Sequence, residues 1–272
     1  MQSFFFIPAN KLHKIAHIKE KGATEIVIDL EDAVKTSEKN NLLERILKYP
    51  NEDIRNCFFR VPLMDSKGNF DFKIFDRLLE NGFTRFVFPK LTGFNDFELC
   101  LKRTKSTLKV ILLIETPRLY MESFNHISNY HQHVYGLALG SHDFISAIQA
   151  KHTLQNLEVL RQQILYFSKA YDILAIDIAS MNIMDGESFR EELMDGFDKG
   201  YDGKFIIHPN QLEIVNGTKF YSDLEYEWAL QVEQKLNKHG GANEFDPILI
   251  NGKVVEKPHI KLAIRIINEF RK

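Results

Sequence analysis

The chain has little cysteine and no excess of either charge. Its 272 residues include two cysteines, Cys57 and Cys100, which lie far apart in apolar surroundings. A disulfide framework or a four-cysteine zinc site is therefore excluded by arithmetic, and a reducing, cytoplasmic location is expected. The 35 basic and 37 acidic residues give a net charge of −2. This balance removes the broad positive field that binding of duplex nucleic acid usually needs.

Long apolar runs are also missing. The first run, within MQSFFFIPANKLHK, is only about five residues long, and no basic segment precedes it. We therefore expect neither a signal peptide nor a membrane segment, and no membrane partner.

What the chain does contain is a rhythm of short apolar runs separated by amphipathic stretches. Continuous apolar runs are typical of strands that are covered on both faces, and alternation with helical stretches is typical of repeated βα units. Eight such units predict a closed (β/α)8 barrel of parallel strands over residues 1–217. The predicted strands begin near residues 3, 25, 56, 85, 109, 134, 173 and 203.

Residues 218–272 read as a C-terminal helical arm. SDLEYEWALQVEQKLNKHG predicts a helix, Gly240 and Gly241 predict a hinge, and KVVEKP predicts a short extended segment before a last helix. Two interpretations stay open: the arm folds over the mouth of a barrel, or it serves packing alone.

Polar residues close most of the predicted strands. In a (β/α)8 barrel the active site collects at the C-terminal ends of the strands. Charged groups that converge there are costly unless they serve a ligand, a metal or one another. The closing residues are Asn10, Asp29, Glu31, Asp32, Arg60, Lys90, Glu115, Asp143, Asp177 and His208.

Glu115 and Asp143 are the candidate metal ligands. Glu115 ends KVILLIE and is followed by Thr-Pro, which stops the strand and fixes the turn, while Asp143 follows the tight turn in LALGSHD. Two carboxylates from adjacent strands favour Mg²⁺ or Mn²⁺ with several waters left for substrate oxygens. The alternatives are a capping or ion-paired Glu115 and a helix-capping Asp143.

IDLEDAV places three acids, Asp29, Glu31 and Asp32, directly after a strand. Hydrogen bonding to metal-bound water is one role for them. The competing interpretation makes Asp32 the N-cap of the following helix.

Arg60 ends an apolar strand in FFRVP, where a guanidinium needs either an anionic ligand or an internal salt bridge. Lys90, in FPK, invites a Schiff-base interpretation but also balances the nearby acids. His208, in IIHPNQ, is a candidate general base, although a structural hydrogen bond is the favoured role.

These motifs, taken in order, resemble the citrate lyase beta-subunit-like proteins of the HpcH/HpaI aldolase superfamily. The similar segments are IPANKLHKIAHIKEKGATEIVIDLEDAV, FRVP, FPK, LLIET, LALGSHD, GKFIIHPNQ and NGKVVEKPH. Each motif alone is weak evidence for the family, but the motifs together occur in the same order and cover nearly the whole chain.

The resemblance implies a carbon–carbon lyase that cleaves or forms a 3-hydroxyacyl thioester of coenzyme A or acyl carrier protein, with a 2-keto acid as the other product. It implies Mg²⁺ bound by Glu115 and Asp143, and a homo-oligomer, a trimer or hexamer, in which a C-terminal segment reaches a neighbouring subunit's site. Glu256 matches that segment's proposed base. The expected catalytic and substrate-binding residues are Arg60, Asp29, Glu31, Asp32, Glu256, Asn10 and Lys90.

Three departures from the family pattern bear on the substrate. Gln2 replaces an arginine before the first strand, Ala9–Leu12 replaces Gly-Asn-Arg-Pro, and Glu256 replaces an aspartate, which moves any base by one methylene. The competing functions are a CoA-independent, pyruvate-type aldolase and a malyl-CoA thioesterase or malate synthase-like enzyme. A non-catalytic, metal-retaining barrel that acts as a binding or accessory protein is the alternative from another class.

Overall fold

The computed structural model describes residues 1–65, 67–238 and 247–271. The chain divides into two compact units, residues 1–217 and 218–272, each with buried apolar side chains of its own. The hinge predicted at Gly240 and Gly241 lies outside the described residues. Within the described parts of the chain, no helix is both long and apolar enough to cross a membrane.

The first unit is a closed barrel of eight parallel strands, which confirms the predicted fold. Each strand pairs with the next, and β8 closes the ring against β1, where Phe205 lies opposite Phe4. The strands are β1 (Gln2–Pro8), β2 (Glu25–Asp29), β3 (Phe58–Arg60), β4 (Arg85–Phe88), β5 (Lys109–Ile114), β6 (Val134–Leu139), β7 (Leu174–Asp177) and β8 (Gly203–Ile206).

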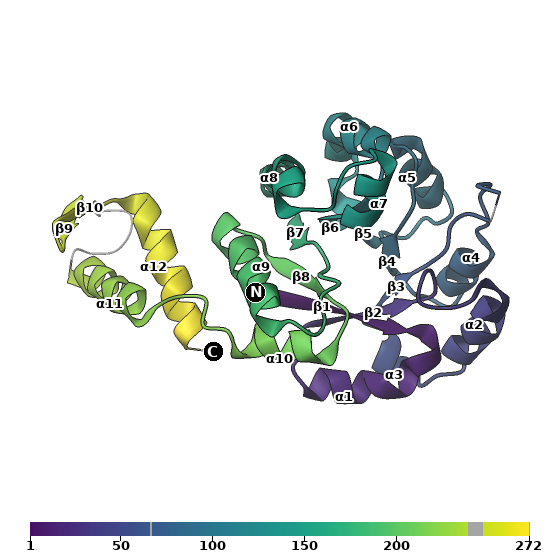
Figure 1. Ribbon diagram of the computed structural model, residues 1–272, viewed down its shortest axis with the longest axis horizontal. Coiled ribbons are helices and arrows are strands. Elements are labelled where there is room, and N and C mark those ends of the chain that lie inside the picture. The colour runs from purple at the N-terminus through teal and green to yellow at the C-terminus, as the bar shows by residue number, and fades with distance from the viewer. Residues whose placement is uncertain (66, 239–246, 272) are drawn as a thin grey trace. The chain divides into compact units, whose positions relative to one another are not determined.

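Helices surround these strands (Figure 1). They form because the stretches between strands carry apolar residues on one face, as in α4, where Ile74, Phe75 and Leu78 are buried. The helices are α1 (Ile15–Glu20), α2 (Lys39–Leu47), α3 (Asn51–Ile54), α4 (Lys73–Glu80), α5 (Phe94–Leu101), α6 (Pro117–His126), α7 (Ser141–Ala147), α8 (Leu154–Ala170), α9 (Gly186–Lys199) and α10 (Pro209–Gly217).

Large side chains fill the barrel interior. Successive strand residues point to opposite faces, so every second residue enters the interior. The ring of Phe4 lies 6.3 Å, centroid to centroid, from both Phe58 and Phe205. The interior is therefore a packed core, and a ligand must bind above it, at the C-terminal rim. The core residues are Phe4, Val27, Phe58, Val87, Ile111, Leu113, Ala138, Ile176 and Phe205.

Asp177 does not join that rim, so its inclusion among the converging strand-end residues was wrong. Ile176 and Phe205 face the interior, and strand alternation therefore turns Asp177 and Lys204 toward the helices. Asp177 is fully buried and accepts hydrogen bonds from Nε and Nη2 of Arg161 on α8, both at 2.9 Å. Lys204 Nζ lies 3.5 Å from the same carboxylate. The group joins the barrel to its helix layer.

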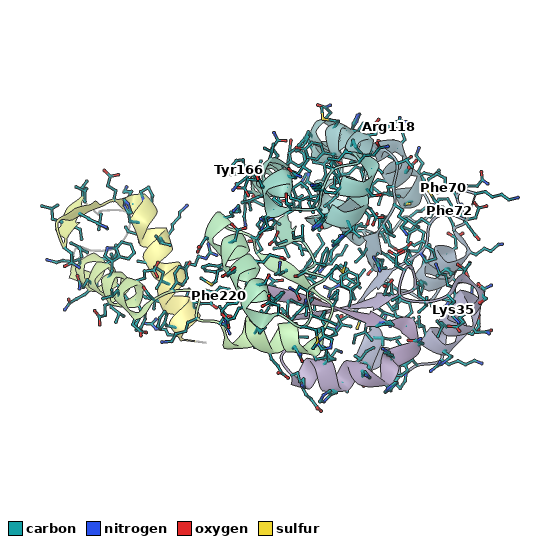
Figure 2. All side chains as sticks on the ribbon, viewed as in Figure 1. Lys35, Phe70, Phe72, Arg118, Tyr166 and Phe220 are labelled. Carbon is teal, nitrogen blue, oxygen red and sulfur yellow. The ribbon has the colours of Figure 1, made fainter. Side chains whose placement is uncertain are left out.

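Two aromatic rings and an arginine pack together in and beside the loop after β3. The rings of Phe70 and Phe72, labelled in Figure 2, stack with centroids 5.1 Å apart. Arg103 lies over the ring of Phe72 at 5.2 Å. Met64 and Phe70 form an antiparallel backbone bridge. These contacts hold the segment that leads away from Arg60.

In the residues described, 218–238 and 247–271, the second unit has two helices and a hairpin: α11 (Asp223–Lys238), β9 (Ile248–Ile250), β10 (Lys253–Val255) and α12 (Lys257–Phe270). Asn251 and Gly252 form the turn of the hairpin with φ of 50° and 75°, a left-handed conformation that these residue types tolerate. The rings of Tyr226 on α11 and Phe270 on α12 stack with centroids 4.2 Å apart. The predicted helices and the extended KVV segment are present, and β9 is an additional strand.

Candidate active site

Asp29, the last residue of β2, holds the site together. Its side chain is 2% exposed. It accepts hydrogen bonds from the backbone N–H groups of Glu31 at 2.8 Å and Ala33 at 3.3 Å, and from Nε and Nη2 of Arg60 at 2.9 and 2.5 Å. An ionised carboxylate offers about four acceptor positions, and these bonds use them. These contacts give Asp29 a positioning role toward Arg60, and its expected bond to metal-bound water stays a prediction.

Arg60 lies between Asp29 and the cavity. Its guanidinium stacks over the ring of Phe6 at 5.1 Å, and its Nη1 lies 3.4 Å from Asp32 and 3.8 Å from Glu31. Burial acts to lower the pKa of Arg60, but the hydrogen bonds and charge of Asp29 outweigh it and raise the pKa. Arg60 thus forms the internal salt bridge that was one interpretation, while Nη1 keeps donors for a ligand.

Glu31 and Asp32 form a coupled acid pair. Burial, followed by a hydrogen bond with Asp32, raises the pKa of Glu31 to about 7. Partial burial acts to raise the pKa of Asp32, but hydrogen bonds with Glu31 and Lys90 outweigh it and lower the pKa. The two shifts run in opposite directions, so a proton binds to Glu31 more readily than to Asp32. Asp32 is not a helix N-cap, because Lys35 occupies the N-cap position of the next helical turn, Thr36–Glu38.

Lys90 contacts this pair. Its Nζ lies 2.5 Å from Glu31 and 2.7 Å from Asp32. Burial acts to lower the pKa of Lys90, but hydrogen bonds to Asp32 and Glu31 outweigh it and raise the pKa. A Schiff base needs a neutral amine, so these contacts disfavour the nucleophile interpretation. They support the alternative, in which Lys90 balances the charge of the acids.

Glu115 directly follows β5 and is 4% exposed. Thr116 then caps α6 by accepting a hydrogen bond from the N–H of Leu119 at 3.2 Å, and Pro117 begins the helix. The Glu115 carboxylate accepts a short hydrogen bond from the backbone N–H of Lys90. Lys90 has φ of 56°, a left-handed conformation that is uncommon for a residue with a side chain.

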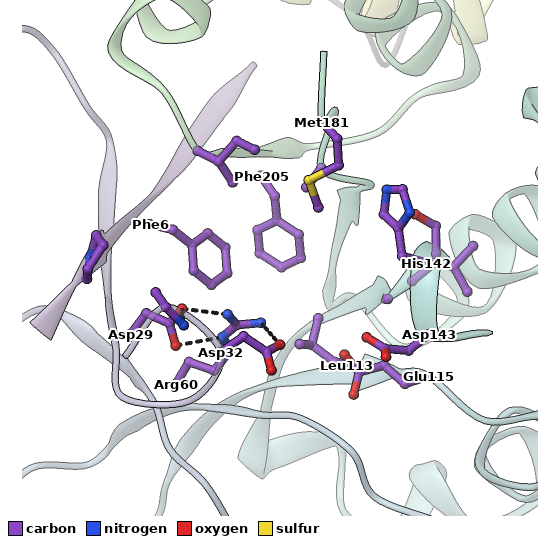
Figure 3. A pocket seen from close by; sticks show the side chains of 17 residues that line it. Phe6, Asp29, Asp32, Arg60, Leu113, Glu115, His142, Asp143, Met181 and Phe205 are labelled. Atoms are coloured by element: carbon purple, nitrogen blue, oxygen red, sulfur yellow. Dashed lines mark hydrogen bonds and ion pairs between the residues drawn. The ribbon is translucent and has the colours of Figure 1, made fainter. Parts of the chain in front are cut away.

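Asp143 lies in the first turn of α7, beside Glu115 (Figure 3). Burial raises the pKa of Glu115 to about 8; the Lys90 N–H acts against this shift, and the charge of Asp143 adds to it. Asp143 is not the cap of α7, because Gly140 occupies the N-cap position. A Cβ on Gly140 would lie 2.2 Å from Cγ of Glu115, so only glycine leaves room for this carboxylate.

These groups line one cavity of about 370 Å³ (Figure 3). Its polar part contains Asp29, Asp32, Arg60, Glu115 and Asp143. Its remaining lining is mostly carbon. The residues there are Phe6, Pro8, Ala33, Leu113, Leu139, Gly140, Ala179, Met181, Phe205 and Ile207, together with Ser141 and His142.

Five expected residues do not line this cavity. Glu31 and Lys90 line a neighbouring pocket and contact Asp32 from there. The other three are Asn10, His208 and Glu256. Asn10 is exposed in the short 3-10 helix Ala9–Lys14. His208 accepts a hydrogen bond from the N–H of Asn210 at 3.2 Å at the start of α10, which confirms its structural role. Glu256 belongs to the second unit, where it is exposed and its N–H donates to Nδ1 of His259 at 2.9 Å. Gln2 begins β1, at the end of the strand opposite the rim.

The apolar lining was not among the residues expected from the sequence. Phe6, Leu113 and Phe205 lie one or two residues before a strand end, and their identity as interior residues depends on which alternate positions face inward. His142 was also missed, although it directly precedes Asp143. Its ring stacks on His152, with centroids 4.0 Å apart.

Glu115 and Asp143 suit a hard divalent cation. A buried carboxylate beside a second carboxylate is unfavourable without a compensating cation. The two cations of the site, Arg60 and Lys90, form their ion pairs with other acids. Across the residues that the structure describes, no cluster of three or more His, Cys, Asp or Glu side chains surrounds a metal position. Water and substrate oxygens would therefore complete the coordination of Mg²⁺.

Comparison with known proteins agrees with this arrangement. Residues 2–209 match the HpcH/HpaI aldolase/citrate lyase family. The chain belongs to this family. The resemblance seen in the motifs is thereby confirmed, and the protein is an enzyme of the aldolase and citrate lyase type.

Two relatives show the range within the family. The chain is 27% identical to a (3S)-malyl-CoA thioesterase of Cereibacter sphaeroides, over 96% of this chain and 92% of that protein. It is 25% identical to the mitochondrial citramalyl-CoA lyase of Homo sapiens, over 96% and 83%. The structure of CitE from Mycobacterium tuberculosis in complex with magnesium, acetoacetate and coenzyme A has a TM-score of 0.82 at 20% identity, covering 100% of this chain and 98% of that one. This likeness shows the fold.

Proposed function

We propose that this protein is a Mg²⁺-dependent carbon–carbon lyase that converts a 3-hydroxyacyl thioester of coenzyme A into an acetyl thioester and a 2-keto acid, or the reverse. The observation that carries the proposal is the Glu115 and Asp143 pair, which shares one rim cavity with Arg60. The complexes of relatives with magnesium and coenzyme A support both cofactor assignments. A cytoplasmic location stays a prediction.

Arg60 binds the substrate carboxylate in this proposal. Asp29 fixes two guanidinium nitrogens, so Nη1, which lies 3.4 Å from Asp32 at the cavity, is held in one orientation. Preorganised charge of this kind stabilises a transition state without reorganisation. Mg²⁺ held by Glu115 and Asp143 would supply Lewis-acid polarisation of the keto acid oxygens.

Proton transfer falls to the remaining acids. Cleavage removes the proton of the substrate hydroxyl, breaks the carbon–carbon bond and returns a proton to the methylene carbon of the acetyl thioester. Asp32 lines the cavity, so with both acids ionised Asp32 accepts the hydroxyl proton and passes it to Glu31, whose pKa is raised. Glu256, on the arm of a second subunit in a homo-oligomer, protonates the carbon. Lys90 keeps the acid pair in place.

A direct assay separates the candidate reactions. Purified protein with Mg²⁺ is incubated with malyl-, citramalyl- and citryl-CoA. A lyase releases acetyl-CoA and a keto acid without free thiol, and Glu115→Gln abolishes this activity. Glu44→Gln, which alters only a surface ion pair with Arg77, is the matched control.

The names of several relatives favour one second candidate, a malyl-CoA thioesterase. This enzyme would release free coenzyme A thiol and malate, with no keto acid. Cleavage of a free hydroxy-keto acid alone would instead identify a CoA-independent aldolase. If no substrate turns over although Mg²⁺ binds, the accessory-protein hypothesis replaces the lyase.

A further inference from the structure

A serine and a histidine that carbon–carbon cleavage leaves unused share a hydrogen bond at the rim cavity. Ser141 is the first residue of α7, is 4% exposed and lines the cavity. Its Oγ lies 2.9 Å from Nε2 of His152, which belongs to the loop between α7 and α8. When the His152 ring carries its proton on Nδ1, Nε2 accepts the proton of the serine hydroxyl in this bond.

The ring of His152 is held in one orientation by a second histidine. It stacks on the ring of His142, with centroids 4.0 Å apart and an angle of 5° between the ring planes. His142 also lines the cavity (Figure 3). Partial burial, followed by the charge of His142, lowers the pKa of His152, and the charge of Glu192 acts against this shift. His152 is therefore mainly neutral at neutral pH and able to accept a proton.

A serine hydroxyl becomes a nucleophile when a neighbouring base takes its proton, and a histidine at hydrogen-bond distance is a common base. A serine on the turn from a strand to a helix also has the placement of the nucleophile in α/β-hydrolases. We propose that Ser141 and His152 form a nucleophile–base pair that hydrolyses the thioester bond, a reaction separate from carbon–carbon cleavage. The inference rests on the proposed function only because that function brings an acyl thioester into this cavity.

The hydrolysis balances with water as the one added reactant. Ser141 Oγ attacks the thioester carbonyl carbon, and its proton moves to Nε2 of His152. The carbon–sulfur bond breaks, the coenzyme A sulfur takes that proton, and the acyl group stays on Oγ as an ester. Water then attacks this ester and gives a proton to His152, the bond from the carbonyl carbon to Oγ breaks, and Oγ takes the proton back. The products are the free coenzyme A thiol and a carboxylic acid.

Positive charge at the cavity favours the oxyanion that forms in both steps. Arg60 has little charge to spare, since it forms ion pairs with three acids of the site. Mg²⁺ bound by Glu115 and Asp143 would add positive charge in the same cavity. The nucleophile–base pair itself consists of protein groups alone, so it can be tested with and without the metal.

A serine-directed reagent tests the pair without turnover of a thioester. The Mg²⁺-loaded full-length protein, and the same protein in EDTA, are incubated with diisopropyl fluorophosphate, which reacts with activated serines. The modified residue is located by peptide mass spectrometry. Ser141 should be labelled in both buffers, and Ser141→Ala should remove the label. Ser146→Ala, at an exposed position of the same helix that the described cavity lining does not include, should leave the label unchanged.

His152→Gln distinguishes a base from a structural anchor. The glutamine amide can keep a hydrogen bond to Oγ of Ser141 but cannot take its proton. The labelling rate should therefore fall by about 100-fold or more, while the melting temperature stays near that of the unaltered protein. In the thioester assay above, the unaltered protein should release free thiol in addition to the keto acid, and Ser141→Ala should abolish the release of thiol.

Absence of the label from Ser141 in the unaltered protein would overturn the inference, and so would absence of free thiol. Labelling of His152→Gln at the unaltered rate would show that His152 is an anchor and would overturn the pair. Release of a keto acid in the thioester assay keeps the proposed function in each of these cases. Labelling of Ser141 and release of thiol without any keto acid would keep the inference and remove the carbon–carbon lyase.

Discussion

Lys90 shows how one residue serves the site through two different groups. Its side chain neutralises Glu31 and Asp32, while its backbone N–H, turned by a φ of 56°, donates to Glu115. From the sequence, Lys90 was interpreted either as a charge partner of the acids or as a nucleophile, because the residue type gives information only on the chemistry of the side chain. The backbone role depends on a positive φ angle, which cannot be predicted from the presence of a lysine at this position. Backbone geometry of this kind explains part of what the sequence could not predict.

Glu115→Gln should separate metal binding from folding. The amide keeps the shape of the side chain but removes the charge that binds Mg²⁺. Since a buried carboxylate beside Asp143 costs free energy in the metal-free chain, the variant should melt at the same or a higher temperature. Calorimetric titration with Mg²⁺ should show affinity lowered by at least about 100-fold. Unchanged Mg²⁺ affinity would remove Glu115 from the metal site.

Gly140→Ala should displace the carboxylate of Glu115 through a steric clash. The new Cβ would lie 2.2 Å from Cγ of Glu115, so the side chain must move. Mg²⁺ affinity and turnover should both fall by about tenfold or more, because misplacement by about 1 Å is costly in catalysis. Gly217→Ala is the control, since its Cβ meets nothing within 4 Å. Equal behaviour of the two variants in a Mg²⁺ titration would contradict this explanation.

At the scale of whole elements, the strands were the most predictable feature. All eight were found, because each is an apolar run that ends at a turn or a polar residue. The rule that strand-end residues meet at the rim placed Arg60 and Glu115 correctly in one cavity. The rule failed for Asp177. The end of a strand fixes the position of a residue along the barrel axis, but it does not fix whether the side chain points into the barrel or toward the helices.

The missed strand β9 has a different cause. Asn-Gly between ILI and KVV is a strong hairpin signal, and the structure contains that hairpin, with Leu249 paired to Val254. The expected hinge at Gly240 and Gly241 and the expected final helix left the ILI segment without an assigned strand, although this local signal was present.

The contact between α8 and α9 should make the barrel sensitive to acid. Burial acts to raise the pKa of Asp195, but hydrogen bonds from Lys199 and Arg161 outweigh it and lower the pKa. The folded state thus binds this proton less readily than the unfolded state, where the pKa is about 3.9. The stabilisation is present above that pH and is lost as the pH falls through the folded-state pKa.

Asp195→Asn should therefore lower the free energy of unfolding by about 1–2 kcal/mol at neutral pH. The difference from the unaltered protein should shrink below about pH 4. Melting temperatures measured from pH 3 to 7 test this, with the exposed Asp198→Asn on the same helix as the control. A difference that stays constant with pH would show that Asp195 does not act through its charge.

At the scale of the whole molecule, the barrel unit has few acids left for the final proton transfer. Among the carboxylates that line the cavity, Asp29 is saturated by hydrogen bonds, Asp32 contacts Lys90 and Arg60, and the other two suit the metal. An additional acid from the second unit would complete the set. Family resemblance points to Glu256, which lies at an exposed position before α12. This is the reason to expect an oligomer in which one chain completes another chain's site.

Complementation between two inactive chains tests this arrangement. Glu115→Gln and Glu256→Gln chains, carrying different affinity tags, are co-expressed, and mixed oligomers are isolated through both tags. If Glu256 acts on a neighbouring barrel, about one third of the sites in mixed trimers, or about one quarter in mixed hexamers, combine an intact Glu115 with an intact Glu256. Thioester cleavage should then recover to about that fraction, while each variant alone stays inactive. Mixed oligomers without activity would show that Glu256 acts within its own chain, and full activity of Glu256→Gln alone would exclude it from the reaction.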